Sequence, residues 1–434
     1  MKRDRYKALL EWKKASSRKP LVLRGARQVG KTYLLKEFGK NEFQNCCYIN
    51  FEEDPIIHSF FDGKLEPNQL IKDLSTYFMQ PINPQTTLII FDEIQECPSA
   101  LTSLKYFNEQ ANEYAIIAAG SLLGIKLEKN KAFPVGKVKF LDLYPLSFFE
   151  FLDAIGKSNL REYLENVSFK NPIKEPFHEQ LIEILRYYIF VGGMPEAVNI
   201  YISTNDYEQV RAAQKDILDG YLLDFAKHAP TSEIMKISGV WQAIPELLAK
   251  ENKKFVYSAI RESARARDYE AAIQWLIDAG LAYQAYNITK PNFPLDSYSN
   301  HHIFKLYLFD VGLLGAMCKI PINLIVRKDQ LFTEFKGALT ENLVAQEIKN
   351  THHEALYYWT SSGTAEVDFI VAYEGKIYPL EIKANFSKKL KSLKVYDEKY
   401  HPLALSRATI RNLKHDGDIY NYPLYLIAKF PITS

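Results

Sequence analysis

The segment Gly25-Ala26-Arg27-Gln28-Val29-Gly30-Lys31-Thr32 determines how the first third of this chain folds. It matches the pattern GxxxxGK[S/T] without a gap, follows the apolar residues 21–23 and opens a stretch with helical spacing. This strand–loop–helix order is the context in which the pattern forms a phosphate-binding loop. Glycines let backbone N–H groups curl around phosphates, and the helix N-terminus adds partial positive charge. The segment therefore predicts a nucleotide site in an α/β fold.

Every residue of the loop is expected to contact ATP, from Gly25, Ala26, Arg27, Gln28, Val29 and Gly30 to Lys31 and Thr32. Lys31 would reach the β- and γ-phosphates, and the Thr32 hydroxyl would ligate Mg²⁺. The alternative is a glycine loop without function, which the strand–loop–helix context disfavours.

Two carboxylates follow the apolar residues 87–91, at Asp92 and Glu93. In a parallel sheet they would lie at the same edge as the phosphate loop, with Asp92 holding Mg²⁺ and Glu93 polarising the attacking water. Solvated acids at a strand end are the alternative. Ser121 ends the next apolar stretch and is expected either to contact the γ-phosphate or to be a turn residue. Asn50, near the end of the second apolar segment (residues 46–51), is expected to hold the Glu93 carboxylate in an inactive position until a partner binds.

The composition is that of an ordinary globular protein. The formal charge of +2 comes from 54 Lys and Arg against 52 Asp and Glu. This near balance argues against a histone-like protein with positive charge over its whole surface, but it allows local basic patches. Four cysteines without a CxxC pair predict reduced thiols. The longest apolar run, residues 114–125, is shorter than the roughly 20 residues of a membrane helix. No apolar signal segment opens the chain, so we expect a cytoplasmic protein without membrane association.

Four domains are expected from the way the pattern changes along the chain. Strands and helices alternate over residues 1–140, the ATPase core, and helices dominate residues 141–228, a helical lid. Residues 229–315 are expected to form a winged helix-turn-helix, and residues 320–434 an α/β restriction-endonuclease-like domain.

The winged-helix expectation rests on three helical patterns, at residues 234–250, 257–264 and 268–279, followed by a β-rich tail. Arg261, Arg265 and Arg267 precede the third pattern, where basic side chains would meet DNA phosphates. Asp268 and Glu270 would approach the same phosphates and weaken the interaction. The alternative is a bundle that only packs against the ATPase.

A second group of candidate catalytic residues lies near the C-terminus. Asp368 is expected on one strand of a hairpin, with Glu381 and Lys383 on one face of the next strand. Glu341, on the preceding helix, would complete the group. Three carboxylates and a lysine suit metal-assisted phosphodiester cleavage: Asp368, Glu381 and Glu341 would bind Mg²⁺, and Lys383 would orient the water.

A basic segment follows that group and could track a phosphate backbone: Lys388, Lys389, Lys391, Lys394, Arg407, Arg411 and Lys414. The spacing of Asp368, Glu381 and Lys383 resembles that of the PD-(D/E)xK nuclease superfamily, with Val367 in place of the proline. Two alternatives stay open. The residues could form a surface ion-pair cluster, or the fold could be kept for binding or docking without cleavage.

The chain as a whole, over residues 12–396, resembles a prokaryotic family of AAA+ ATPases with a C-terminal domain of unknown function. The resemblance is carried by five segments, Arg24–Thr32 (RGARQVGKT), 91–95 (FDEIQ), 120–123 (GSLL), 143–151 (LYPLSFFEF) and 191–197 (VGGMPEA). It implies ATP hydrolysis with Mg²⁺ and a homo-oligomer in which a neighbouring subunit completes the site. Family members often carry Arg where this chain has Lys137, so an arginine-finger role is in doubt at that position.

Two functions follow from these expectations. The first is an ATP-hydrolysing AAA+ protein that acts on or is bound to DNA and carries a candidate metal-dependent nuclease site. The second is a nucleotide-dependent switch that recruits a protein partner through catalytically inactive C-terminal modules.

Overall fold

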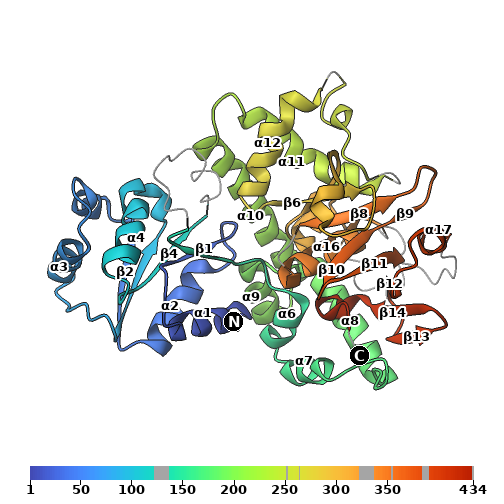
Figure 1. The fold of residues 1–434 in the computed structure, drawn as a ribbon, viewed down its shortest axis with the longest axis horizontal. Coiled ribbons are helices and arrows are strands. Elements are labelled where there is room, and N and C mark those ends of the chain that lie inside the picture. Colours follow the sequence, from blue (N-terminus) through green and yellow to red (C-terminus); the bar gives the residue numbers. More distant parts are fainter. Residues whose placement is uncertain are drawn as a thin grey trace. The chain divides into compact units, whose positions relative to one another are not determined.

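The computed structural model describes residues 1–121, 136–250, 253–262, 264–321, 337–352, 355–383 and 391–432 (Figure 1). Two compact units make up the chain. Unit 1 contains Met1–Tyr144 and Asp278–Gly280, and unit 2 contains Pro145–Ile277 and Leu281–Ser434. Within the described parts, each helix is too short or too polar to cross a lipid bilayer.

Unit 1 is built on a parallel five-stranded sheet of order β2-β3-β4-β1-β5. Its strands are β1 (Leu21–Arg24), β2 (Asn45–Asn50), β3 (Thr87–Asp92), β4 (Ala115–Gly120) and β5 (Lys139–Asp142). Every residue of β3 and β4 is buried, as expected for strands covered on both faces. The predicted parallel α/β sheet is confirmed.

The helical elements of unit 1 are α1 (Arg5–Lys14), α2 (Lys31–Glu42), η1 (Pro55–Phe61), α3 (Pro67–Tyr77), η2 (Ile94–Glu96) and α4 (Pro98–Gln110). Proline opens α3 and α4, where its missing N–H costs no helical hydrogen bond. Phe51, Phe61 and Phe91 pack edge to face in the core beside β3. These contacts fix the carboxyl end of β3, where Asp92 lies.

The first part of unit 2 is helical, as predicted for residues 141–228. It contains α6 (Phe148–Ala154), α7 (Ser158–Glu165), α8 (Glu175–Val191), α9 (Pro195–Thr204) and α10 (Tyr207–His228). A complete capping box, Ser147 with Glu150, starts α6. The tyrosine hydroxyl of Tyr188 on α8 donates to Leu146 O over 2.5 Å and helps to fix the entry to this region.

The next part contains α11 (Ile234–Ala249), η3 (Tyr257–Ala259), α12 (Ala266–Asp278), β6 (Ala282–Ile288), η4 (Leu295–Tyr298), β7 (Ser299–Leu308) and α13 (Val311–Met317). The helix expected over residues 257–264 is wrong, because only the single turn η3 forms there. Phe255 explains the difference: its N–H donates to Phe304 O on β7, and its ring stacks on that of Phe304. Because this contact holds the segment before η3 against β7, the backbone there is extended and not helical. One of the three helices expected for a winged helix is therefore not formed, and the winged helix remains a prediction.

The C-terminal part contains α16 (Ala338–His352), β8 (Leu356–Thr360), β9 (Glu366–Val367), β10 (Phe369–Tyr373), β11 (Lys376–Lys383), α17 (Lys391–Tyr400), β12 (Leu405–Thr409), β13 (Lys414–Asp416), β14 (Ile419–Pro423) and η5 (Leu424–Lys429). The predicted antiparallel hairpin is formed by β10 and β11. One sheet has the order β10-β11-β12-β14-β13 and the other β7-β6-β8-β9. The second sheet joins strands from residues 229–315 and 320–434, which were expected to be separate domains; those boundaries stay predictions.

Candidate active site

The phosphate loop of unit 1 connects β1 to α2, and two glycines define its path. Gly25 has φ +152°, and a Cβ there would lie 2.2 Å from Leu143 O. Gly30 has φ +93° and directly precedes α2. Only glycine meets both requirements without strain. Arg3 supports the loop from the N-terminal segment, because its guanidinium donates to Val29 O over 2.8 Å. Sequence patterns gave no sign of that contact.

Lys31 is almost fully buried at the start of α2, with 6% of its surface exposed. Its ammonium donates to Gly25 O over 2.9 Å and to Ala26 O over 2.8 Å. Burial lowers the pKa of Lys31 to about 8, although the carboxylates of Glu93 and Asp92 raise it in part. A desolvated ammonium of this kind gains from an adjacent phosphate, so its placement suits nucleotide binding.

Thr32 and Asp92 meet at the carboxyl edge of the sheet. Thr32 Oγ1 donates to Asp92 Oδ2 over 2.7 Å, and Tyr48 Oη donates to the same oxygen over 2.9 Å. A hydroxyl and a carboxylate in this position are the oxygen ligands that Mg²⁺ prefers. The structure thus brings the two predicted metal ligands together. Tyr48, on β2, was not predicted.

Glu93 follows β3 in a left-handed backbone conformation, with φ +48°. The amide of Gln95 donates to Glu93 Oε2 over 2.5 Å. Asn50, the expected partner of Glu93, instead accepts a hydrogen bond from the Glu52 backbone N–H. The residue that engages the predicted catalytic carboxylate is therefore Gln95, two positions along the same segment.

The remaining predicted ATP contacts lie around the same edge. Ser121 is buried directly after β4, the neighbour of β1 in the sheet. Gln28 lies in the loop with φ +66°, and the Arg27 guanidinium lies 3.9 Å from Glu52 Oε2. Lys137 pairs with Glu109, Nζ to Oε1, over 2.8 Å.

In unit 2, Glu341, Glu366 and Asp368 form an acidic cluster whose carboxylate oxygens lie within 4.8 Å of one another. Two lysines, Lys253 and Lys305, compensate its charge. Lys305 Nζ lies 2.8 Å from Glu341 Oε1 and 2.6 Å from Glu366 Oε1, and Lys253 also pairs with Glu341. Lys305 is fully buried. Lys305, Lys253 and Glu366 were not among the residues predicted for this site.

The charges in this cluster shift one another's pKa values. Burial alone would raise the pKa of Glu341, but Lys305 and Lys253 outweigh it and lower that pKa. Burial and then the Glu341 charge raise the pKa of Asp368. The Tyr307 hydroxyl donates to Glu341 Oε1 over 2.6 Å. Glu341 is therefore the ionised centre of a buried network.

Glu381 and Lys383 form a separate pair on β11. Glu381 Oε1 lies 2.6 Å from Lys383 Nζ, which agrees with the expected common face. Burial raises the pKa of Glu381. Asp368 was expected on the first strand of the hairpin, but it lies in a bend between β9 and β10. Its side-chain Oδ2 accepts a hydrogen bond from the Ile382 backbone N–H on β11 over 2.7 Å. The structure thus joins Asp368 to Glu341, whereas Glu381 lies outside the three-carboxylate cluster found among the described residues.

The predicted basic residues differ in their exposure. Arg261, Arg265 and Arg267 are exposed, as are Lys391, Lys394 and Lys414. Arg407 is buried and donates to Asn421 Oδ1, so it is not available to a phosphate backbone. Lys388 and Lys389 lie outside the described residues.

Comparison with known proteins identifies three successive regions. Residues 17–152 match the model of an AAA domain. Residues 182–323 and residues 336–425 match two different domains of unknown function. No curated protein matches the chain.

Solved structures with some likeness include the Walker-type ATPase PABY2304 of Pyrococcus abyssi, which is 15% identical over 73% of this chain and 95% of that chain, with a TM-score of 0.45. Another is the Aeropyrum pernix ORC1 protein in complex with DNA, 13% identical over 73% of this chain and 91% of that chain, with a TM-score of 0.30.

The matched AAA domain spans the parallel sheet, the phosphate loop and the Thr32–Asp92 contact. The N-terminal part of this chain is therefore a P-loop ATPase domain of the AAA type, followed by two domains of unknown function.

Proposed function

We propose that this protein binds ATP with Mg²⁺ at residues 25–32 and hydrolyses it. The Thr32–Asp92 contact supports the proposal best, because the two side chains proposed as Mg²⁺ ligands lie within hydrogen-bond distance of each other beside the phosphate loop. Lys31 binds the β- and γ-phosphates, and Ser121 contacts the γ-phosphate. Glu93 accepts a hydrogen bond from the attacking water and receives its proton. Mg²⁺, when bound, would neutralise charge developing on the transferred phosphoryl group.

Phosphate release from ATP by the full chain tests this function. Lys31→Ala should remove nucleotide binding or turnover, while Lys40→Ala, an exposed lysine on the same helix, should leave both unchanged. Full activity of Lys31→Ala would refute the assignment of the loop.

We further propose that unit 2 contacts DNA through Arg261, Arg265 and Arg267. Their exposure around the start of α12 supports this, with Arg261 and Arg265 before the helix and Arg267 in its first turn. Arg267 Nε lies 3.7 Å from Asp268 Oδ1, which offsets part of its charge. Binding of duplex DNA, followed by fluorescence anisotropy, should weaken when all three become Gln, and its salt dependence should become shallower. Lys391→Gln with Lys394→Gln, on α17, tests the basic segment separately. Unchanged binding in both variants would favour the switch that recruits a protein partner.

The second candidate function is metal-dependent nucleic-acid cleavage by Asp368, Glu381, Lys383 and Glu341. As arranged, the cluster fits a divalent cation poorly, because two ammonium groups already contact its carboxylates. We therefore propose that this part of the chain binds a partner without cleaving it. Mg²⁺- or Mn²⁺-dependent cleavage that is lost in both Asp368→Ala and Lys383→Ala would overturn this proposal.

We propose that the protein forms a homo-oligomer, as AAA+ ATPases generally do when a neighbouring subunit completes their site. Light scattering after gel filtration, with and without ATP, measures the mass of the assembly.

An ATPase assay with and without DNA separates the two functions. Stimulation by DNA would favour the protein that acts on DNA, and slow turnover that DNA does not change would favour the nucleotide-dependent switch.

A further inference from the structure

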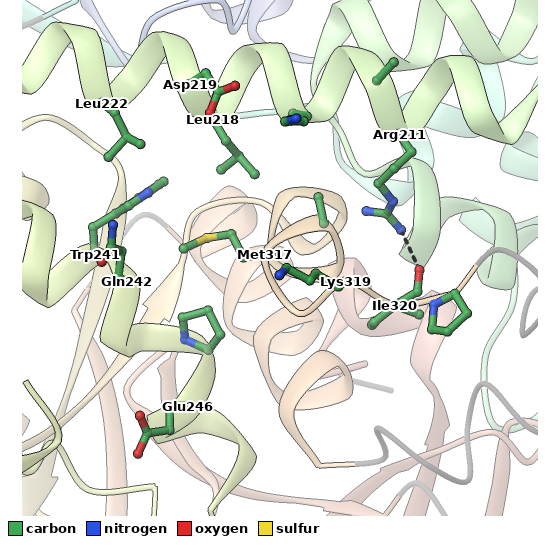
Figure 2. A pocket seen from close by; sticks show the side chains of 15 residues that line it. Arg211, Leu218, Asp219, Leu222, Trp241, Gln242, Glu246, Met317, Lys319 and Ile320 are labelled. Atoms are coloured by element: carbon green, nitrogen blue, oxygen red, sulfur yellow. Dashed lines mark hydrogen bonds between the residues drawn. The ribbon is translucent and has the colours of Figure 1, made fainter.

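Unit 2 contains a cavity of about 970 Å³ that has no part in the proposed nucleotide site (Figure 2). It lies between α10, α11 and the end of α13. All of its lining residues lie between Arg211 and Pro321, inside the first domain of unknown function. Its size is at the upper end of the ~300–1,000 Å³ typical of small-molecule sites.

The cavity has an apolar end and a basic end, both visible in Figure 2. Leu222, Trp241 and Met317 lie together at one end, and Leu218 lies between them and Arg211. Arg211 lies at the other end beside Ile320, and Lys319 lies between the two ends. An apolar lining with a few convergent polar groups is typical of sites that bind and orient a small ligand.

The partners of Arg211 within the described part of the chain are neutral. Its guanidinium donates to Gln214 Oε1 over 2.8 Å and to Ile320 O over 3.4 Å, and it lies 4.2 Å from the Phe190 ring centroid. Among the described residues, no carboxylate pairs with it. Burial lowers the pKa of Arg211 to about 10, which expresses the cost of holding this charge away from water.

The other charges around the cavity leave a basic excess near Arg211. Lys215 and Lys319 line the cavity at its exposed rim, and neither forms an ion pair with a described residue. Glu246 also lines it, but its Oε1 lies 2.8 Å from Lys250 Nζ and is already compensated. Asp219 is exposed and reduces this excess without removing it. An anionic group would be favoured beside Arg211.

We propose that this cavity binds a small amphipathic acid, with its apolar body against Leu218, Leu222 and Trp241 and its carboxylate on Arg211. A guanidinium matches a carboxylate through two parallel hydrogen bonds, which suits a monocarboxylic acid better than a neutral lipid. Lys319 adds charge at the rim. The ligand is thus an aliphatic or aromatic monocarboxylate.

Isothermal titration of the full chain with laurate and with 2-naphthoate tests the proposal and separates aliphatic from aromatic acids. At least one should bind, and dodecanol or naphthalene methanol, which lack the charge, should bind more weakly. Intrinsic tryptophan fluorescence should also change on binding, because Trp241 lines the cavity, and Trp241→Phe should remove that change. Arg211→Gln should weaken the acid at least about tenfold, as expected for losing a charge-assisted hydrogen bond, and leave the neutral alcohol unaffected.

Two further variants keep the result interpretable. Ala316→Trp should fill the cavity and abolish binding. Lys236→Gln, a half-buried lysine of α11 that does not line the cavity and pairs with Glu233, should bind as the unmodified chain does. Circular dichroism and binding of fluorescent ATP show that each variant is folded. Failure of both acids to bind, or equal binding by Arg211→Gln, would overturn the proposal and leave the proposed ATPase function untouched.

Discussion

Thr32 Oγ1 and Asp92 Oδ2 are 2.7 Å apart although 60 residues separate them in the sequence. The contact exists because β1 and β3 are both parallel neighbours of β4, so their carboxyl ends reach the same edge of the sheet. Tyr48 on β2 donates to the same Asp92 oxygen. The fold thus holds the proposed metal-binding hydroxyl and carboxylate next to each other.

Glu93→Gln is expected to separate nucleotide binding from hydrolysis. The amide keeps the shape of the side chain but cannot take a proton from water, so turnover should fall by about 10²–10⁴-fold. Affinity for fluorescent ATP should change little. Phosphate release under saturating ATP measures the first quantity, and hydrolysis close to that of the unmodified chain would exclude Glu93 as the base.

Gln95→Ala removes the hydrogen bond that engages Glu93. If Gln95 holds the carboxylate idle, basal turnover should rise; if it orients the carboxylate for catalysis, turnover should fall. Fluorescent-ATP binding distinguishes either role from misfolding, because misfolding would weaken nucleotide binding as well as turnover. Thr102→Ala, at a half-buried position on α4 whose hydroxyl donates to Pro98 O, should change neither turnover nor nucleotide binding.

ATP binding should weaken as pH rises through about 8. The folded pKa of Lys31 is lowered to about 8 by burial, so the ammonium is present below that pH and lost above it. Above it, binding phosphates requires uptake of a proton, and affinity should fall by up to about tenfold per pH unit. Fluorescent-ATP titrations between pH 6.5 and 9.5 measure this. A flat profile would show that Lys31 stays charged throughout or does not contact the phosphates.

Without nucleotide, the same group gives the opposite trend in stability. Its pKa is higher in the unfolded chain, about 10.4, so the folded state binds fewer protons between about 8 and 10.4. The contribution of Lys31 therefore becomes less unfavourable as pH rises through that window. Nucleotide should reduce this effect, because phosphates stabilise the ammonium.

Gly25→Ala should destabilise unit 1 much more than Gly63→Ala. Both glycines have positive φ, so both substitutions carry backbone strain of about 1–2 kcal/mol. Only Gly25 has a backbone oxygen, Leu143 O, 2.2 Å from the added Cβ, whereas nothing lies within 4 Å at Gly63. Overpacking against fixed backbone adds about 3 kcal/mol or more. Urea unfolding of the two variants gives the difference, and equal losses would mean that the loop adjusts freely.

How much the sequence predicted differs between the two units. In unit 1 the motif, the strand pattern and the position of Asp92 all followed from local sequence, because each parallel strand ends at the same edge. Tyr48 and Arg3 were missed because their contacts depend on which strands and helices become neighbours. Gln95 lay within a recognised segment, but its spacing from Glu93 does not reveal which way its amide points.

In unit 2 the strand that carries Glu381 was predicted, whereas Asp368 lies in a bend between β9 and β10 and not on the expected hairpin strand. The partners of both carboxylates were not predicted. Lys305 is the clearest case. It stands alone in the apolar stretch 303–309, and an isolated lysine in a buried strand signals an acidic partner. Its partner Glu341 is 36 residues away on α16, so only the tertiary fold identifies it.

Removing one side of the Lys305–Glu341 pair should strongly destabilise unit 2. Lys305→Met leaves Glu341 buried with the Lys253 ammonium and the Tyr307 hydroxyl, and Glu341→Leu leaves Lys305 with Glu366. Each single change should cost about 3–5 kcal/mol, because it leaves a buried charge incompletely compensated. The double variant should recover part of that loss, since both charges leave together. Urea unfolding of all four proteins gives the coupling energy.

The pH dependence of the same pair provides an independent check. The pKa of Glu341 is lowered to about 2 in the folded chain, so its stabilising contribution is present above its unfolded value, near 4.3, and is lost as pH falls toward 2. Glu341→Leu should therefore flatten the acid limb of the curve of unfolding free energy against pH.

Metal ions offer a further contrast. If Lys305 and Lys253 compensate the charge of the acidic cluster, Mn²⁺ should not stabilise the unmodified chain by binding there. Lys305→Met should then gain Mn²⁺-dependent stabilisation, and stabilisation of both proteins to the same degree would show that the ammonium groups do not exclude the metal.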